Sequence, residues 1–232
     1  MSVSVGSEIG ALRRVLVHTP GPEVLAVTPS TREDFLYDDI IDRASARREH
    51  EQLVAVLERY AQVHQLRTLL TDVLSDADAR LALLHEALRV QLAGRLAEDL
   101  CALDAAALAD ALITGHAAEP GPLARALNEP TYALPPLPNL FFTRDTAMAV
   151  GDHVLLGAMR YGARWSEGLL MRHVFGRHPA LANRGILYDG SGERRHGHTL
   201  EGGDVHVLTD DTVMIGFSER SSPAAIDHLC EL

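Results

Sequence analysis

Two carboxylates flank a pair of glycines in the segment Leu-Glu-Gly-Gly-Asp at residues 200–204. Adjacent glycines form a tight turn that residues with side chains resist, and residues 205–208 read as a strand. A turn that brings Glu201 and Asp204 to a strand end holds two negative charges in place, which suits cation binding or proton transfer. A hairpin whose acids only face water is an equal alternative for this segment by itself.

The pattern around Asp204 occurs a second time in the chain. Asp145 and Asp204 are each followed, 12 positions later, by a glycine that ends an apolar run (157 − 145 and 216 − 204). Each copy predicts two strands joined by a tight turn and then a helix, near 166–175 and 222–230, and the first copy adds a strand at 185–188. A ββαβ unit repeated at 59 residues (204 − 145) indicates a modular fold.

The repeat would bring acids together if its units pack around an axis. Asp145, Glu201 and Asp204 would then form a cluster, and three close carboxylates repel one another unless a cation or a shared proton intervenes. Phe142 would add an apolar wall, which favours a flat, delocalised cation such as guanidinium.

An arginine follows the second strand of each copy, Arg164 in the first and Arg220 in the second. Arginine binds carboxylates through a two-pronged fork. An acidic pocket with two arginines at its rim suits a zwitterion that is cationic at one end and carboxylate at the other, and free arginine is the obvious candidate. Ordinary surface ion pairing is the alternative for both side chains.

A metal site is the competing interpretation of the glycine turn, with ligands drawn from His196, His198, Glu201, Asp204 and His206. No HExxH or similar spacing is present, so we favour guanidinium binding and expect neither a metal nor a cofactor. No nucleophile is evident either. The chain has no GxSxG motif and no lysine for Schiff-base chemistry, and Cys230 lies in a predicted helix.

Composition narrows the class of protein. The 232 residues carry a formal net charge of -11, which argues against nucleic acid or an anionic membrane as a partner.

The N-terminus lacks the pattern of a signal peptide, no apolar run has membrane-spanning length, and the two cysteines suggest no disulfide framework, so we expect a cytoplasmic protein.

The elements that would position these residues fall into three parts, predicted at 1–74, 75–130 and 131–232. The first part contains a strand at 11–18, a loop at 31–41, a helix within 42–62 and a short strand at 63–69. Alanine and leucine dominate residues 75–128, which predicts an all-α insertion that begins at a helix start near Ser75–Asp78. The third part holds the repeat, as the second propeller unit and a partial third unit, and residues 1–74 would be the first unit.

Four motifs in this order resemble the arginine deiminase family of the guanidine-modifying, amidinotransferase-like superfamily. They are Leu137-Pro138-Asn139, Phe142-Thr143-Arg144-Asp145, Leu200-Glu201-Gly202-Gly203-Asp204 and Gly216-Phe217-Ser218-Glu219-Arg220-Ser221-Ser222. Any one of them alone is weak, whereas the ordered set is specific. The resemblance covers nearly the whole chain, including residues 8–20 and the acidic loop at 36–39.

The resemblance implies an α/β propeller of the pentein type, built from five ββαβ units with an all-α helical insertion. It also implies hydrolysis of L-arginine to L-citrulline and ammonia without a metal, through attack by a cysteine and proton transfer by a histidine. Asp145 would hold the guanidinium, and Glu201 would support the proton transfers. Asp204 would help to form the acidic surface of the pocket, and Phe142 would line its wall. The α-carboxylate would be held by Asn139, Arg164 and Arg220. The loop around Leu36 would close over the substrate.

The departure from the family pattern concerns the reacting residues. The family's His-Leu-Asp segment and its cysteine have no match here and would lie beyond Leu232. We therefore expect an incomplete propeller that carries the substrate-binding half of the site, inactive alone, in a homo-oligomer or with a complementing C-terminal part. The alternatives are another guanidine-modifying enzyme, such as an amidinotransferase or an arginine dihydrolase, and a non-catalytic arginine-binding subunit.

Overall fold

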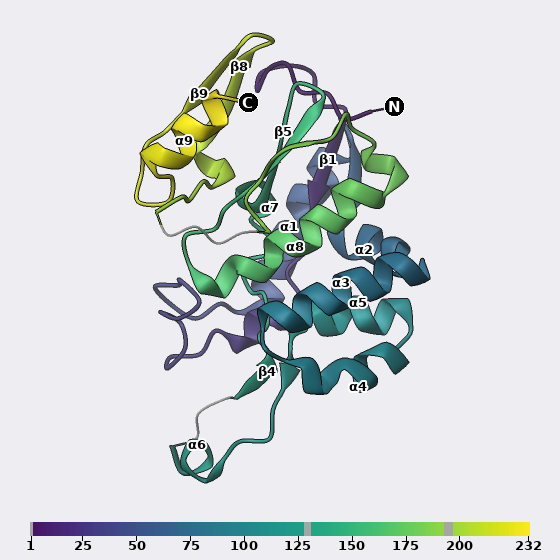
Figure 1. Ribbon diagram of the computed structural model, residues 1–232, viewed down its shortest axis with the longest axis vertical. Helices are drawn as coiled ribbons and strands as arrows, with labels where there is room; N and C mark the ends of the chain where they lie inside the picture. Colours follow the sequence, from purple (N-terminus) through teal and green to yellow (C-terminus); the bar gives the residue numbers. More distant parts are fainter. Residues whose placement is uncertain (1, 128–130, 193–196) are drawn as a thin grey trace. The chain divides into compact units, whose positions relative to one another are not determined.

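The computed structural model describes residues 2–127, 131–192 and 197–232, in which helices and short β-sheets are mixed (Figure 1). This confirms the predicted α/β class. The chain divides into two compact units. One comprises Met1–Val17, Leu57–His64 and Phe142–Leu232, and the other comprises His18–Val56 and Gln65–Phe141.

The first unit contains both copies of the repeat. In the first copy, strands β5 (Ala147–Val150) and β6 (His153–Leu156) pair antiparallel, helix α8 (Trp165–Arg177) follows, and β7 (Ile186–Asp189) returns parallel to β6. The predicted ββαβ order is therefore confirmed. In the first copy the glycine has a steric reason, because a Cβ at Gly157 would lie 2.5 Å from the carbonyl oxygen of Asp145.

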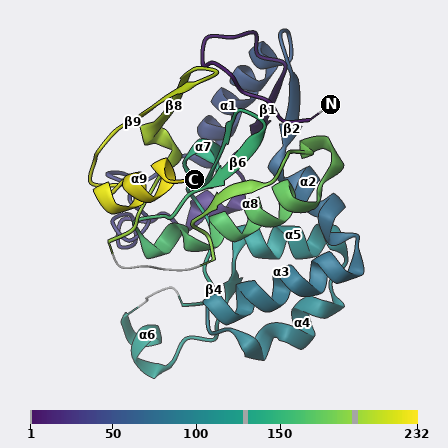
Figure 2. The same ribbon diagram turned by 45° about the horizontal axis from the view of Figure 1, so that its top comes forward.

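The second copy forms the antiparallel hairpin β8 (Val205–Thr209) and β9 (Thr212–Ile215), followed by helix α9 (Pro223–Cys230), as predicted (Figure 2). Ser222 caps α9, since its side chain accepts a hydrogen bond from the Ala225 amide. The two copies share one hydrophobic core of buried side chains, which are Met148, Leu155, Ala158, Tyr188, Leu200, Val205 and Ala225.

The two repeat aspartates lie in short helical turns before the strands, not at the strand ends where the sequence pattern placed them. Asp145 is in the one-turn helix α7 (Thr143–Thr146), directly before β5. Asp204 is in the 3-10 turn η5 (Gly202–Asp204), directly before β8. In each turn the aspartate N–H donates to the carbonyl oxygen three residues earlier, that of Phe142 or Glu201, so the backbone holds both acidic residues at defined positions.

The remaining elements of the first unit are short. Strand β1 (Arg14–Val17) confirms the predicted N-terminal strand and forms a two-stranded sheet with β2 (Gln62–Gln65). The 3-10 turns η3 (Gly162–Arg164) and η4 (Pro179–Leu181) lie at the two ends of α8.

Helices dominate the second unit, as the alanine- and leucine-rich composition predicts (Figure 1). Asp76 and Asp104 cap two of them, since each carboxylate accepts a hydrogen bond of 2.8 Å from the amide three residues later. Fully buried leucines, such as Leu70, Leu83 and Leu108, fill the space between the helices. The elements of this unit are η1 (Pro22–Ala26), α1 (Arg43–Leu57), α2 (Leu66–Leu74), α3 (Ala77–Val90), η2 (Gly94–Leu96), α4 (Ala97–Ala102), α5 (Ala105–Thr114), β3 (His116–Ala117), α6 (Pro122–Leu127) and β4 (Tyr132–Leu134).

Two local predictions for this region are wrong in part. The strand expected at 63–69 ends at Gln65, and α2 begins at Leu66, because Leu66, Leu69 and Leu70 recur at helical spacing and are buried on one face. The insertion is also not purely helical. Strand β3 pairs antiparallel with β4, with His116 opposite Leu134, and a pairing across that sequence distance leaves no local pattern.

Helix α1 confirms the helix predicted within 42–62, but it has no buried residue. Leu53 and Val56, on its predicted apolar face, are each 52% exposed. In the part of the chain that the structure describes, no helix combines the length and the apolar character needed to cross a membrane.

Candidate functional site

Arg164 is the centre around which the predicted site residues of the first unit gather. It lies at the end of η3 and directly before α8, and only 3% of it is exposed. Its Nη1 atom is 2.7 Å from Oδ2 of Asp145 and 3.9 Å from Oε2 of Glu201. Two of the three acids that the sequence pattern assigned to one cluster therefore contact the same guanidinium group, and Arg164 is buried between them instead of lying at the rim.

A third acid, Glu167, completes the surroundings of Arg164 and was not among the predicted site residues. Its carboxylate accepts hydrogen bonds from Nε at 3.1 and 3.2 Å and from Nη2 at 2.9 Å. The side chain is fully buried in the first turn of α8. An acid three residues after Arg164, inside a helix that is otherwise largely apolar, was the available signal.

Glu201 is held by backbone groups as well as by charge. Its Oε1 atom accepts a hydrogen bond of 2.9 Å from the Arg160 amide, and its Oε2 atom lies 3.3 Å from Nη1 of Arg220. The Glu201 amide donates to Oγ of Ser221 at 3.0 Å. The residue is 4% exposed, so its carboxylate has a fixed orientation beside Arg164.

Burial and charge shift the pKa values of this cluster. Burial raises the pKa of the Glu167 carboxyl to about 7, against the opposing effect of Arg164. Burial also raises the pKa of Glu201, although the Arg160 amide and the two arginines favour its ionised form. For Arg164, burial alone would lower the pKa, but Glu167 and Asp145 raise it above its ordinary value, so the guanidinium stays charged.

Two aromatic rings accompany the two arginines. The guanidinium carbon of Arg164 lies 5.8 Å from the ring centre of Phe142, and that of Arg220 lies 4.7 Å from the ring centre of Tyr161. Both distances are within the range of cation–π attraction. Phe142 remains 47% exposed, so a large part of its ring is available as a wall for a ligand.

The glycine pair allows the Glu201 turn to approach Asp145 closely. A Cβ at Gly202 would lie 2.0 Å from the carbonyl oxygen of Arg144, and a Cβ at Gly203 would lie 3.1 Å from Oδ1 of Asp145. Arg144 reinforces the contact, since its Nε donates to the Gly202 carbonyl oxygen at 3.0 Å. The turn is thus built against the helix that carries Asp145.

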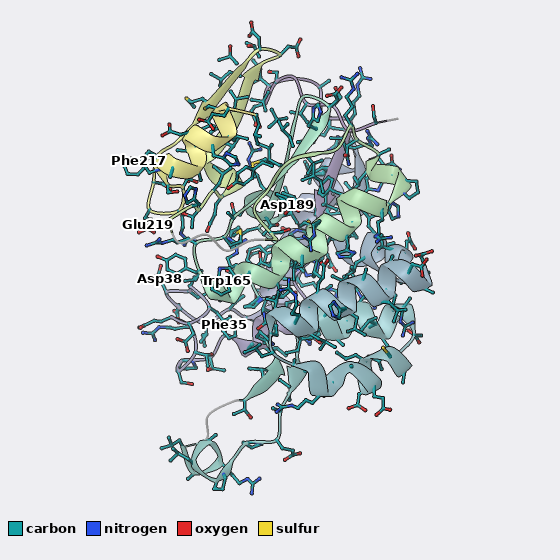
Figure 3. All side chains as sticks on the ribbon, in the orientation of Figure 1. Phe35, Asp38, Trp165, Asp189, Phe217 and Glu219 are labelled. Atoms are coloured by element: carbon teal, nitrogen blue, oxygen red, sulfur yellow. The ribbon has the colours of Figure 1, made fainter. Side chains whose placement is uncertain are left out.

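Asp204 faces the segment that carries Arg220. Its Oδ2 atom accepts a hydrogen bond of 2.6 Å from the Ser218 hydroxyl, whose oxygen in turn accepts from the Arg220 amide at 2.9 Å and from the Ser221 amide at 3.2 Å. Asp204 therefore orders the loop between β9 and α9, on which Phe217 and Glu219 also lie (Figure 3).

Asn139 belongs to the second unit, where it is 4% exposed. Its side-chain amide donates to the Phe35 carbonyl oxygen at 2.9 Å, and the Tyr37 hydroxyl donates to the Pro138 carbonyl oxygen at 2.8 Å. The loop that carries Phe35 and Asp38 (Figure 3) is therefore tied to the Pro138–Asn139 segment.

The alternative metal ligands do not form a cluster among the described residues, where no group of three or more His, Cys, Asp or Glu side chains could hold a metal ion. His196 lies outside the residues that the structure describes. Cys101 and Cys230 are both exposed. Chemically, the cluster around Arg164 offers ionisable carboxylates and guanidinium groups, which suit binding a charged ligand and moving protons.

Comparison with known proteins points to one family. The sequence profile described as "Arginine deiminase" matches residues 33–231. Proteins named arginine deiminase are similar over 98–99% of this chain: 33% identity over 240 residues in Metamycoplasma arthritidis, 33% over 243 in Levilactobacillus brevis and 31% over 244 in Listeria monocytogenes. The chain covers 57%, 59% and 59% of these relatives, respectively.

Proposed function

We propose that this chain, which belongs to the arginine deiminase family, supplies the substrate-binding half of an enzyme that hydrolyses L-arginine to L-citrulline and ammonia. The main support for this proposal is that two carboxylates, those of Asp145 and Glu201, contact the same buried guanidinium group. Carboxylates that already surround one guanidinium have the charge and geometry to receive another.

The two carboxylates receive different roles. Asp145 is proposed to hold the substrate guanidinium, which is consistent with its place beside Gly203 at the partly exposed side of the cluster. Glu201 is proposed to support the proton transfers, because a carboxyl whose pKa is raised by burial can hold a proton closer to neutral pH. Asp204 is proposed to be part of the acidic surface that binds the substrate, and its carboxylate accepts a hydrogen bond from the Ser218 hydroxyl.

The α-carboxylate of arginine is assigned to Arg164 and Arg220, and Phe142 is assigned to the wall of the pocket. Arg220 supports this assignment, because its guanidinium is part-exposed over Tyr161 and can bind a further anionic partner besides Glu201 and Glu219. Agmatine lacks the α-carboxylate, so binding of L-arginine in preference to agmatine is expected.

The chemical step requires residues that have no match in this chain. In the proposed reaction, a cysteine thiolate forms a bond to the guanidinium carbon, ammonia leaves after protonation, and water then cleaves the carbon–sulfur bond to give citrulline. A histidine moves the protons. We propose that both residues come from the portion of the enzyme that this chain does not cover, and that no metal takes part.

The second repeat copy supports a partner for this chain. At residues 154–156 of β6, which β7 covers, no more than 1% of each side chain is exposed. At the matching positions of β9, 59 residues later, Val213 is 39% exposed and Met214 is 53% exposed. We propose that β9 receives a parallel strand in the complete protein, either from a complementing C-terminal part or from another copy, which would extend the incomplete propeller.

We propose the following organisation of the chain. Residues 1–74 form a first propeller unit, 75–130 the helical insertion, and 131–232 the second and a partial third unit of a cytoplasmic, pentein-type enzyme. An amidinotransferase or an arginine dihydrolase would differ in the acceptor of the amidino group or in the number of ammonia molecules released. A non-catalytic arginine-binding subunit would keep the acidic surface and never meet a nucleophile.

Citrulline release tests the proposed function. The chain alone is expected to release none from L-arginine, and activity is expected when it is co-expressed with the portion of the Metamycoplasma arthritidis relative that it does not cover. That portion alone is the control. Turnover by the chain alone would contradict the proposed division and make Cys230 the first nucleophile to test. A complemented pair that binds arginine without turnover would favour the binding subunit.

A further inference from the structure

Glu167 lies within the site but has no role in the proposed reaction. The guanidinium of arginine carries one N–H at Nε and two at each Nη. Glu167 accepts from Nε and Nη2 of Arg164, at distances of 2.9 to 3.2 Å. The fork of Arg164 is therefore directed at Glu167, and Nη1 is the nitrogen that contacts Asp145.

The contact between Arg164 and Asp145 has a consequence for substrate binding. Asp145 is the carboxylate proposed to hold the substrate guanidinium, and in this structure a guanidinium of the protein is already 2.7 Å from it. A substrate guanidinium that binds both oxygen atoms of Asp145 must compete with Nη1 of Arg164 for Oδ2. Glu201, 3.9 Å from Nη1, is too distant to replace that hydrogen bond without movement.

Arg164 cannot leave the site altogether when the substrate arrives. Glu167 is fully buried, so an ionised Glu167 without Arg164 would be an unpaired charge in the protein interior. The carboxylates of Glu167 and Asp145 also raise the pKa of Arg164, which keeps the guanidinium charged. The Nε–Nη2 edge is consequently the fixed part of Arg164, and Nη1 is the part that can exchange partners.

We propose that Glu167 is a positioning residue that anchors the Nε–Nη2 edge of Arg164, so that Nη1 exchanges between Asp145 in the empty site and the α-carboxylate of bound arginine. This inference rests on the proposed function, because it assigns Asp145 to the substrate guanidinium. L-arginine brings its own carboxylate for the displaced Nη1, whereas agmatine leaves Nη1 without that partner. Arg164 thereby selects the amino acid over the amine.

Calorimetric titration of the full chain with L-arginine and with agmatine tests the proposal. The double variant Arg164→Met/Glu167→Gln removes both charges and leaves no unpaired buried charge. It is expected to bind agmatine about tenfold more tightly than the parent, since Asp145 loses its competitor. Its preference for L-arginine is expected to shrink but not to disappear, because Arg220 is also assigned to the α-carboxylate. Arg67→Met/Asp110→Asn, which removes an exposed two-pronged pair, is the matched control and should leave both affinities unchanged.

Other outcomes separate this inference from the function on which it rests. If agmatine binds the double variant no better than the parent, Arg164 does not compete for Asp145 and the exchange is refuted. If the parent binds neither ligand, the proposed function fails at its binding step, and the anchoring is decided by NMR of the ligand-free chain.

In that NMR experiment, the Nε–H of Arg164 should exchange slowly with solvent in the parent and in Asp145→Asn, and rapidly in Glu167→Gln. Slow exchange in Glu167→Gln, or rapid exchange in Asp145→Asn, would overturn the anchoring by Glu167.

Discussion

Gly202 brings the glycine turn against the helix that carries Asp145, and replacing it with alanine should separate the two. A Cβ at this position would lie 2.0 Å from the Arg144 carbonyl oxygen and 2.9 Å from Cε of Met148. An ordinary contact begins near 3.4 Å, so the backbone segments must move apart by about 1.4 Å.

The expected cost of Gly202→Ala is large because the obstacle is backbone. Overpacking of a well-packed site costs about 1–3 kcal/mol. The Arg144 carbonyl belongs to α7, and the Arg144 side chain bonds the Gly202 carbonyl oxygen at 3.0 Å, so the turn and helix are tied together where they must separate. We therefore expect a loss of about 3 kcal/mol in the free energy of unfolding.

Gly203→Ala is the matched comparison. Its Cβ would lie 3.1 Å from Oδ1 of Asp145. This oxygen is the end of a side chain, so the carboxylate can shift by a few tenths of an ångström to make room. We expect less than about 1 kcal/mol of destabilisation. The displaced carboxylate should, however, weaken arginine binding about tenfold, because a charge-assisted hydrogen bond depends on its geometry.

Urea unfolding followed by circular dichroism measures the first effect, and calorimetric titration with L-arginine measures the second. Equal stability of Gly202→Ala and the parent would refute the close approach of the turn to α7. Unchanged arginine affinity in Gly203→Ala, together with unchanged stability, would refute the placement of Asp145 against the turn.

Three further predictions follow from burial, titration and capping. Leu155→Ala, in the buried strand β6, should lower the free energy of unfolding by about 2–5 kcal/mol. Met214→Ala, at the matching and more exposed position of β9, should lower it by less than about 1 kcal/mol. Equal losses in urea unfolding would contradict the difference in burial. Burial raises the pKa of Glu167 from 4.5 to about 7, so the unfolded chain loses this proton at a lower pH than the folded chain. The free energy of unfolding should therefore fall by about 3 kcal/mol as the pH rises from about 4.5 to about 7, because of this group. Glu167→Gln should lack that component, and identical pH profiles for variant and parent would exclude it. Ser222→Ala should cost about 1 kcal/mol by removing the cap of α9, while Ser222→Gly should cost only a few tenths, and thermal unfolding would show whether they differ.

The repeat was the part of the fold most accessible from sequence. Two aspartates, each 12 residues before a glycine, predicted strands and helices that the structure confirms. In the first copy the reason is steric, since Gly157 lies against the Asp145 backbone and tolerates no side chain there. Where no such constraint fixes the spacing, as at Leu66, a short apolar run was assigned to a strand and is the start of α2.

In the candidate site, too, some residues could be predicted from the sequence and others could not. Asp145, Glu201 and Arg164 were recognisable because the repeat and the charges of these residues predicted an acidic pocket with arginines beside it, and the structure places the three side chains together. Glu167 was harder to recognise, because its place three residues after Arg164 was the only signal and an acid near a helix start is usually solvated. Only its complete burial beside Arg164 distinguishes it, and burial depends on how α8 packs.

Titration of this chain with L-arginine, with Asp145→Ala and Glu201→Ala beside the parent, measures whether the two carboxylates bind a guanidinium. We expect saturable heat of binding in the parent and at least tenfold weaker binding in both variants. Binding should be unchanged in Asp189→Ala, an acid of the same unit that pairs with Arg172 instead. Parent-like arginine affinity in Asp145→Ala and Glu201→Ala would contradict the assignment of these carboxylates to the guanidinium-binding surface.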